Sequence, residues 1–430
     1  MPKSDDKIVK IRDPIYGFIY PDAQELEIIN HPVFQRLRRI KQLSLTDMVY
    51  PGATHTRFEH SLGVMQMASD MFDCLIKRES NLKTLRLNES DIFRTRKILR
   101  LAALLHDTGH APFSHAGENT MPLLPEDHPR YEPNTEKPKR YDHEDYSIAI
   151  IKFLLKDIIE DHPSAQNSNI KVDEVTFLLG DKAAKPRNIL LVLKEIISGQ
   201  IDADRADYLL RDSLHLGVSY GIYDKNRLVN SITLGHTDTD DVVLAIEEGG
   251  WHIAESLVIA RYQMFSQVYF HKTRRIFDYH ISEALKEILL ANRVGGGVFR
   301  PPTSNANLLK YLEFDDWKVH GDIKNGKGGE HGKHILERTP YRCIKTWEQA
   351  LSEETTNEIN DLEKCYSDKD YFVDKDVSTK WYKLDKDIWI SNDQTGKSYP
   401  LSLKSQIVKS IGQPEVTRFY VSRDMKDESN

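Results

Sequence analysis

The stretch LLHDTGH, residues 104–110, decides the fold, because an apolar helix ends here on a histidine and an aspartate. Residues 98–105 are apolar nearly all round a helix, which predicts a central helix rather than a superficial one. His106 and Asp107 follow directly, and His110 comes about one turn later. The stretch therefore predicts a buried helix that carries chemically active side chains at its end.

An imidazole beside a carboxylate is a donor set that suits Mn, Fe, Co, Ni or Zn better than Ca. Neighbouring side chains on a helix diverge by about 100°, so His106 and Asp107 share an ion only if it lies beside the helix between them. The pair alone is weak support for a metal site, because a capped helix end with exposed polar residues has the same sequence.

Two further stretches strengthen the prediction of a metal site. HTRFEHSLGV (55–64) places His60 before another amphipathic helix. GQIDADRADYLLRD (199–212) interleaves aspartates with apolar residues, as a purely solvated run of charges would not. The order His, His-Asp, Asp resembles the HD phosphohydrolase superfamily. Together with FQRLRRIKQL (34–43) and HED (143–145), the motifs resemble the deoxynucleoside triphosphate triphosphohydrolases of the dGTPase-like branch.

The resemblance implies a set of metal ligands, which are His60, His106, Asp107 and Asp204. Asp202 and Asp207 compete for the last place, although Asp204 aligns with the ligand of the family. A bound divalent ion acidifies a water molecule and acts as a Lewis acid, and both effects serve phosphate-ester hydrolysis. Which ion is native, among Mg, Mn, Fe, Ni and Zn, stays open.

The resemblance also implies a catalytic group at the same helix end, consisting of His110, His143, Glu144 and Glu118. His110 matches a general acid that protonates the leaving 5′-oxygen, with the other three in support. An imidazole suits this role because its pKa lies near the working pH. His115, in APFSH, is read equally well as a hydrogen-bonded structural histidine.

Substrate contacts are implied for a larger set, which comprises Gln42, Leu43, Arg57, His115, Arg205, Tyr208, Asp212 and Lys272. The basic members match triphosphate contacts, and the others match the sugar site. An apolar side chain packed against the sugar leaves a 2′-hydroxyl without a partner, which disfavours ribonucleotides. Without the resemblance, Leu43 is an ordinary packing residue. YFHKTRRIFDYH (269–280) is read equally well as a segment that holds phosphates and bases and as an amphipathic helix with a solvated basic face.

FQRLRRIK also matches a regulatory site. In nucleotide-activated members, residues matching Gln35 and Arg38 hold an allosteric nucleotide at a subunit interface. The acidic residue that reads guanine there falls at Asn30, which weighs against guanine-specific activation. The alternative is that Arg36, Arg38 and Arg39 form salt bridges on the surface or between subunits. The resemblance further implies a homodimer or homotetramer.

Composition sets limits on the partners. The chain has 59 Lys and Arg against 66 Asp and Glu, a net charge of −7, so composition makes no case for nucleic acid or membrane as the main partner. Three cysteines, odd in number and far apart, suit a reducing compartment. With no apolar run of about 20 residues and no leader-like N-terminus, we expect a cytoplasmic protein.

The expected fold class is mainly α, a helical HD-domain core with small β elements and a C-terminal α+β appendage. We divide the chain into a core (1–293), a linker or insertion (294–340) and a small C-terminal domain (341–430). Residues 233–250 predict a β-hairpin, 122–142 a surface loop, and 321–334, rich in glycine, a flexible stretch.

The leading functional hypothesis is metal-dependent hydrolysis of a dNTP to deoxynucleoside and inorganic triphosphate, by attack of water on the α-phosphorus. A second hypothesis is an HD-type phosphodiesterase or nucleotidase that acts on another nucleotide. A third is a non-catalytic nucleotide sensor or single-strand binder. A pure binder needs no acid/base set, so the motifs favour an enzyme.

Overall fold

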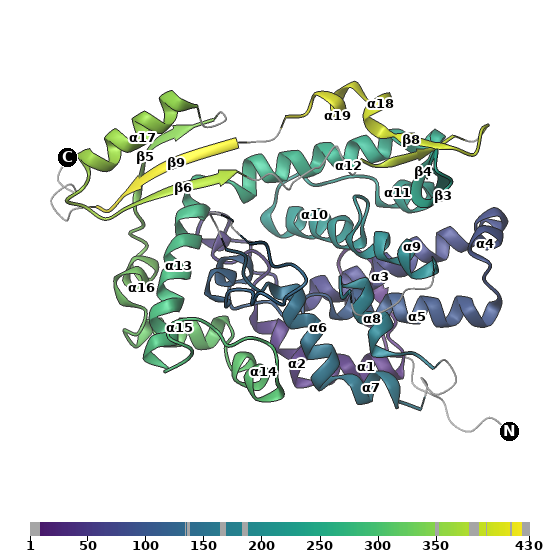
Figure 1. The fold of residues 1–430 in the computed structure, drawn as a ribbon, viewed down its shortest axis with the longest axis horizontal. Helices are drawn as coiled ribbons and strands as arrows, with labels where there is room; N and C mark the ends of the chain where they lie inside the picture. The colour runs from purple at the N-terminus through teal and green to yellow at the C-terminus, as the bar shows by residue number, and fades with distance from the viewer. Residues whose placement is uncertain are drawn as a thin grey trace.

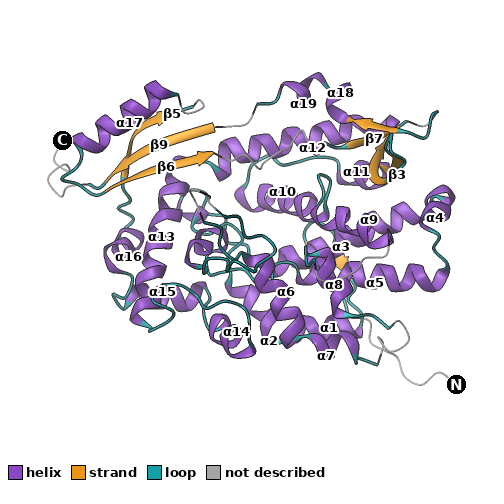
Figure 2. Ribbon diagram, viewed as in Figure 1, coloured by secondary structure: helices purple, strands orange, loops and turns teal. Residues whose placement is uncertain are grey.

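The computed structural model describes residues 9–133, 135, 138–163, 169–182, 188–348, 352–377, 387–392, 394–412 and 415–423. Helices dominate, and the strands form three small sheets (Figures 1 and 2). The predicted fold class is therefore confirmed. Within the described part of the chain, none of the helices has the length and apolarity needed to cross a bilayer.

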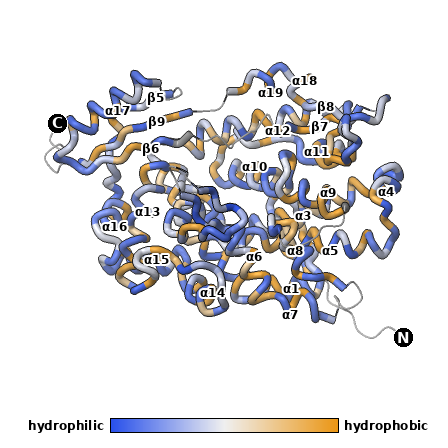
Figure 3. Tube along the Cα trace, in the orientation of Figure 1, coloured by the Kyte–Doolittle hydropathy of each residue, from blue (hydrophilic) through white to orange (hydrophobic). Residues whose placement is uncertain are grey.

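The core is built around helices α3 (Arg57–Ile76), α5 (Glu89–Leu105) and α10 (Ala203–Leu216). α5 packs along α3, which also carries α10. Every residue from 98 to 105 is buried, as the apolar run predicted. The one charge in this run, Arg100, is neutralised by the buried Glu25 at 2.7 Å. Hydrophobic residues concentrate where α3 meets its neighbours in the middle of the molecule (Figure 3).

The remaining helices of the first 293 residues surround this centre. They are α1 (Ala23–Asn30), α2 (Pro32–Gln35), α4 (Glu79–Leu85), α6 (His143–Leu154), α7 (Lys156–Glu160), α8 (Val172–Leu178), α9 (Asn188–Ser198), α11 (Lys225–Ser231), α12 (Trp251–Met264) and α13 (Lys272–Ala291). A π-turn, η5 (Phe265–Tyr269), separates α12 from α13. The described residues of 122–142 form a loop, as predicted.

Two of the sheets have short, simple pairings. β1 (Ile11–Asp13) and β2 (Gly17–Ile19) form a hairpin near the N-terminus. β3 (Ile232–His236) and β4 (Val242–Glu247) pair antiparallel, which confirms the hairpin predicted in this region. β7 (Trp389–Ser391) runs parallel to β4, and β8 (Ser398–Pro400) completes a four-stranded sheet.

The C-terminal third therefore contributes to the core instead of standing apart from it. Its strands β7 and β8 extend a sheet of the core, and α18 (Leu401–Lys404) and α19 (Gln406–Ser410) pack on α12. The third sheet, β5 (Arg342–Trp347), β9 (Glu415–Val421) and β6 (Tyr371–Val377), carries α17 (Glu353–Cys365). This sheet and helix form the predicted α+β appendage.

The prediction of a flexible stretch at 321–334 was wrong. The segment after residue 293 folds into α14 (Asn305–Leu312), α15 (Asp316–Lys324) and α16 (Gly329–Leu336). Phe299, Tyr311 and Phe314 are buried in the main core. The glycines serve close packing here: a Cβ on Gly328 would lie 3.1 Å from Ile323. Composition alone did not distinguish tight packing from flexibility.

Candidate active site

Four side chains, from helices α3 and α10 and from the turn that follows α5, converge at the end of α5. His60 lies in the first turn of α3, and Asp204 lies in the first turn of α10. His60 Nε2 is 3.0 Å from Asp204 Oδ1 and 3.7 Å from Asp107 Oδ2. His106 Nε2 is 3.2 Å from Asp107 Oδ1 and 3.9 Å from Asp204 Oδ1. The structure thus brings ligand atoms of His60, His106 and Asp204 within 4.8 Å of one another, and Asp107 lies beside both histidines. We call these four predicted ligands the HD set.

The second nitrogen of each imidazole is already occupied. His60 Nδ1 is 2.8 Å from Asp207 Oδ2, and His106 Nδ1 donates to the carbonyl of Ala103 at 2.8 Å. Both Nε2 atoms therefore face the carboxylates, and His106 Nε2 is buried without a hydrogen-bond partner. A metal ion fits this arrangement, because ligating histidines usually bond a carboxylate or carbonyl through the other nitrogen.

The two competing aspartates have other partners. Asp202 caps α10 by accepting from the Arg205 amide at 2.7 Å, and its second oxygen pairs with the Arg205 guanidinium. Burial raises the pKa of Asp202 to about 7. Asp207 holds both His60 and Arg211. These contacts leave Asp204 as the aspartate of α10 that faces the other three side chains.

Electrostatics keep Asp204 ionised, as a carboxylate ligand of a metal must be. Burial raises the pKa of Asp204, but the hydrogen bond and charge of His60 outweigh it and lower the pKa to about 2. Burial likewise lowers the pKa of His60, while hydrogen bonds to Asp204 and Asp207 raise it to about 10. Arg57 pairs with Asp107 Oδ2 at 2.6 Å, and both side chains are buried.

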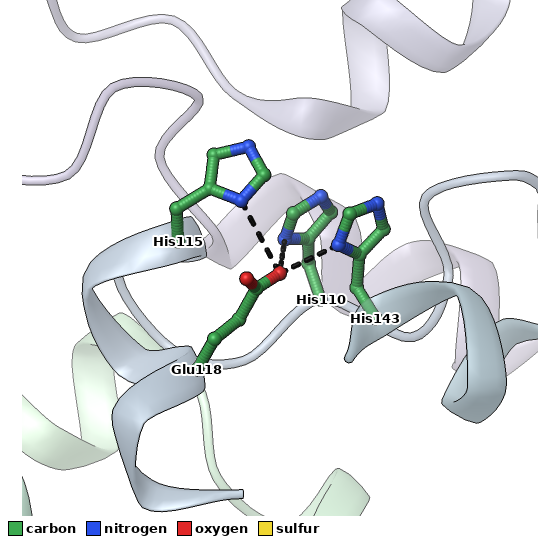
Figure 4. Close-up of side chains that lie close together, drawn as sticks. All are labelled: His110, His115, Glu118 and His143. Carbon is green, nitrogen blue, oxygen red and sulfur yellow. Dashed lines mark hydrogen bonds and ion pairs between the residues drawn. The ribbon is translucent and has the colours of Figure 1, made fainter. Parts of the chain in front are cut away.

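A second group, which we call the His–Glu cluster, adjoins the HD set and consists of His110, His115, Glu118 and His143 (Figure 4). The three Nδ1 atoms lie 3.8, 3.2 and 2.5 Å from Glu118 Oε1, in the order His110, His115 and His143. The rings of His110 and His143 stack at 3.8 Å and 12°. The cluster contains three of the four predicted catalytic residues.

Charge in the His–Glu cluster is unevenly distributed. Burial lowers the pKa of His143, but the carboxylate of Glu118 raises it to about 9. Burial also lowers the pKa of His110 well below its ordinary value, and the Arg57 charge lowers it further. For Glu118, burial raises the pKa, but His115 and His143 bring it well below its usual range. At neutral pH, the cluster therefore holds a protonated His143, a neutral His110 and an ionised Glu118.

The sequence after α5 brings the two groups together through a tight loop. Gly109 packs so closely on α6 that a Cβ would lie 2.3 Å from the carbonyl oxygen of His143. Phe113 and Ser114 both adopt left-handed backbone angles, with φ of 58° and 56°. The Phe113 amide donates to Asp316 Oδ1 at 2.7 Å, so α15 helps to fix the loop.

Both groups open into one cavity of about 730 Å³, which lies within the size range of small-molecule sites. Seven of the eight predicted substrate residues line it, namely Gln42, Leu43, Arg57, His115, Arg205, Tyr208 and Asp212. Asp212 bonds His55 Nε2 through one oxygen and accepts from the Tyr269 hydroxyl through the other, at 2.8 and 2.6 Å. Glu144 lines the cavity as well, but Glu118 rather than Glu144 hydrogen-bonds His143.

Lys272 does not line this cavity. It is the first residue of α13 and lines a separate cavity with Arg338 and Arg342. Arg274 and Arg275 line the main cavity instead. The stretch 269–280 therefore contributes basic residues to this cavity, although not Lys272. Lining residues outside the predicted set include Ser44, Arg130 and Lys194.

The arginines of FQRLRRIK have three different environments. Arg36 is fully buried and donates to the carbonyls of His110 and Phe314, so assigning it to a surface or intersubunit salt bridge was wrong. Arg39 pairs with Asp315 at 2.5 Å. Arg38 is exposed, lies 3.5 Å above the Phe58 ring and donates to Gln35 at 2.9 Å. Asn30 is the exposed last residue of α1.

Comparison with known families identifies the core. The HD domain family matches residues 57–212, and the HD associated region matches 223–320. The chain belongs to the HD-domain superfamily. The HD domain match begins at α3 and ends in α10, so it includes the whole HD set.

Relatives of this HD-domain protein include an uncharacterized protein of Methanocaldococcus jannaschii, 39% identical over 65% of this chain and 49% of the relative. Human deoxynucleoside triphosphate triphosphohydrolase SAMHD1 is 29% identical over 72% of this chain and 50% of the relative. A crystal structure of a hypothetical protein from Aquifex aeolicus is similar with a TM-score of 0.74 at 28% identity, covering 97% of both chains. The chain spans about half the length of these curated relatives.

Proposed function

We propose that this HD-domain protein hydrolyses deoxynucleoside triphosphates to deoxynucleoside and inorganic triphosphate. The main support is that the HD set and the His–Glu cluster open into the same cavity. A metal-type donor set beside an acid/base group suits hydrolysis of a phosphate ester. Similarity to a relative named a dNTP triphosphohydrolase supports this choice of substrate.

In this proposal, His60, His106, Asp107 and Asp204 hold a divalent ion, which supplies Lewis acidity and an acidified water. Asp207 and the Ala103 carbonyl orient the two imidazoles so that Nε2 of each is available. Arg57 holds Asp107 in place, and its contact with Ser114 at 2.8 Å ties α3 to the loop after α5. These contacts therefore orient the predicted ligands before an ion or a substrate binds.

We assign proton donation to His143 rather than to His110. His143 is the cationic member of the pair at neutral pH, since Glu118 raises its pKa to about 9. Desolvation keeps the stacked His110 neutral. A protonated imidazole can deliver its proton to the leaving 5′-oxygen, and Glu118 retains the ring afterwards. His110 then acts as a neutral neighbour in contact with both the cluster and Asp107.

The remaining lining residues suit the other parts of a nucleotide. Cationic side chains can balance the triphosphate, and the cavity has Arg57, Arg130, Lys194, Arg205, Arg274 and Arg275. Leu43, with Tyr208 and the Asp212–Tyr269 pair, forms a mixed apolar and polar wall that suits a deoxyribose. A 2′-hydroxyl placed against Leu43 would lose its hydrogen bonds to water, which disfavours ribonucleotides.

A product assay tests this function. The chelator-stripped protein is reloaded with Mg or Mn and offered each dNTP and rNTP, singly and in pairs, and the products are separated by ion exchange. Deoxynucleoside plus intact triphosphate supports the proposal. Release of pyrophosphate, of monophosphate, or hydrolysis of cyclic or linear dinucleotides alone would replace it with the nucleotidase or phosphodiesterase alternative. Activity only with nucleotide pairs would add an activating nucleotide site.

A further inference from the structure

We infer that the His–Glu cluster is a second transition-metal site, distinct from the HD set, that takes a Zn²⁺-like ion. Its four members each offer one ligand atom, and these atoms all lie within 4.8 Å of one another. The side chains come from the loop after α5, from η3 (Ser114–Thr120) and from the start of α6. In Figure 4 the three rings surround the Glu118 carboxylate and turn their Nδ1 atoms toward it.

His110 provides independent support for an ion at this cluster. Its side chain is fully buried, and its Nδ1 has no hydrogen-bond partner among the described residues. Glu118 Oε1, at 2.5 Å from His143 and 3.2 Å from His115, satisfies those two rings, but it lies 3.8 Å from His110 Nδ1. Buried polar atoms are normally paired, since an unpaired one costs about 1–3 kcal/mol. An ion bonded to Nδ1 removes this cost.

The other ring nitrogen of His110, Nε2, also has a neighbour that suits a metal-ligating histidine. Its Nε2 lies 3.2 Å from Asp107 Oδ1. A ligating histidine commonly has a carboxylate on its other nitrogen, which fixes the ring and makes it a better donor. His110 therefore lies between two centres, with Nε2 toward a carboxylate of the HD set and Nδ1 toward the His–Glu cluster. Asp107 links the two.

Donor chemistry selects the class of ion. Three imidazoles and one carboxylate match the ligands and coordination number of Zn²⁺ and Co²⁺, whereas Mg²⁺ prefers oxygen. Ligand atoms about 2.1 Å from a tetrahedral ion lie about 3.4 Å apart. The observed separations from Glu118 Oε1, 2.5 to 3.8 Å, bracket that spacing. Small side-chain movements therefore suffice to admit the ion.

One consequence rests on the proposed function. An ion on the Nδ1 atoms of His110 and His143 takes the lone pairs that proton transfer requires. Occupation of the second site is then inhibitory, so the triphosphohydrolase activity falls as Zn²⁺ is added beyond the first equivalent. The occupancy itself is independent of any activity and is tested without nucleotide.

The experiment is a Co²⁺ titration of the chelator-stripped full chain, followed by visible absorption, with bound metal counted by elemental analysis after gel filtration. His115→Ala removes a ligand whose side chain is 62% exposed, so it leaves the folded core intact. Asp204→Asn, at a side chain 38% exposed, weakens the HD set alone. His331→Ala is the matched control, because His331 belongs to another histidine group, with His280 and His334.

The expected stoichiometry is two ions per chain for wild type and His331→Ala, and one for His115→Ala and for Asp204→Asn. The ion kept by Asp204→Asn should show the intense absorption of four-coordinate Co²⁺. One ion in the wild type, or two in His115→Ala, would overturn the inference. If Glu118→Gln also retains both ions, the inference fails as well. Two ions without triphosphohydrolase activity would leave this site standing and refute only the proposed function.

Discussion

Asp207 Oδ2 lies 2.8 Å from Nδ1 of His60, and both side chains are fully buried. The carboxylate fixes the ring and directs Nε2 toward Asp204 and Asp107. Asp207, which sequence analysis treated as a rival ligand, thus orients His60, which is itself a predicted ligand. The same carboxylate holds Arg211 through two further contacts, so its position is determined from two sides.

Asp207→Asn should therefore weaken metal binding by about 10- to 100-fold, the usual cost of losing such an orienting partner. The affinity is measured by competition with a chelator of known strength. Asp212→Asn is the matched control: it is also buried on α10, but it bonds His55 and Tyr269 instead of a ligand. Equal weakening by both variants would show that Asp207 has only a general structural role.

The pair of His143 and Glu118 should make stability depend on pH. The pKa of His143 rises from an unfolded value of about 6.5 to about 9 in the metal-free protein. A raised pKa contributes stability that is fully present below pH about 6.5 and is lost as the pH rises through about 9. The contribution is at most about 3 kcal/mol.

This is tested by the free energy of unfolding of metal-free wild type and His143→Gln, measured from pH 6 to pH 10. The difference between the two proteins should shrink across that range. The comparison isolates His143, because other titrating groups such as His60 are common to both proteins. A difference that stays constant or grows with pH would contradict the assigned charge state.

Arg36 should be a major contributor to stability. Its guanidinium is buried, and it donates to the carbonyls of Phe314 and His110, which joins the segment after residue 293 to the loop after α5. Arg36→Met leaves these acceptors unpaired and should cost roughly 3 kcal/mol. Arg38→Met, at an exposed side chain two residues away, should cost less than about 1 kcal/mol. Denaturant unfolding gives both values, and similar costs would contradict this role.

Leu43 should control the choice of sugar if the proposed function holds. Leu43→Ala opens space on the cavity wall, so discrimination of dNTP over rNTP, taken as the ratio of kcat/KM values, should fall roughly tenfold. Leu45→Ala serves as the control, because Leu45 is buried in the core and does not line the cavity. An unchanged ratio in Leu43→Ala would remove Leu43 from the sugar site.

The sequence predicted the parts of this protein whose signals are local. The apolar run 98–105 predicted a buried helix that carries His106 and Asp107 at its end, and the β-hairpin followed from alternation. Such local signals do not predict packing between segments that are distant in the sequence. Local patterns do not indicate that Arg36 reaches across to Phe314. Nor do they indicate that glycine-rich 321–334 forms the end of α15 and most of α16, with Gly328 packed close to Ile323.

In the candidate site, too, local motifs were predicted from the sequence, whereas contacts between distant segments were not. The motifs named the side chains that the structure brings together at the end of α5, and their role as metal ligands stays a prediction. The partner of His143 was not predicted, because Glu118 comes from another turn 25 residues earlier, whereas Glu144 is its neighbour in sequence. Nor did residue patterns place Lys272, which begins α13 and lines a separate cavity.

The central claim is that a metal at the HD set and a proton on His143 together cleave a dNTP between its sugar and its triphosphate. The most direct test is hydrolysis in ¹⁸O-labelled water by the metal-loaded protein, with the products resolved by ion exchange and mass spectrometry. The account predicts intact triphosphate that carries the label, unlabelled deoxynucleoside, and loss of both products in Asp204→Asn. Label in the deoxynucleoside, or no triphosphate with any nucleotide or pair, would contradict it.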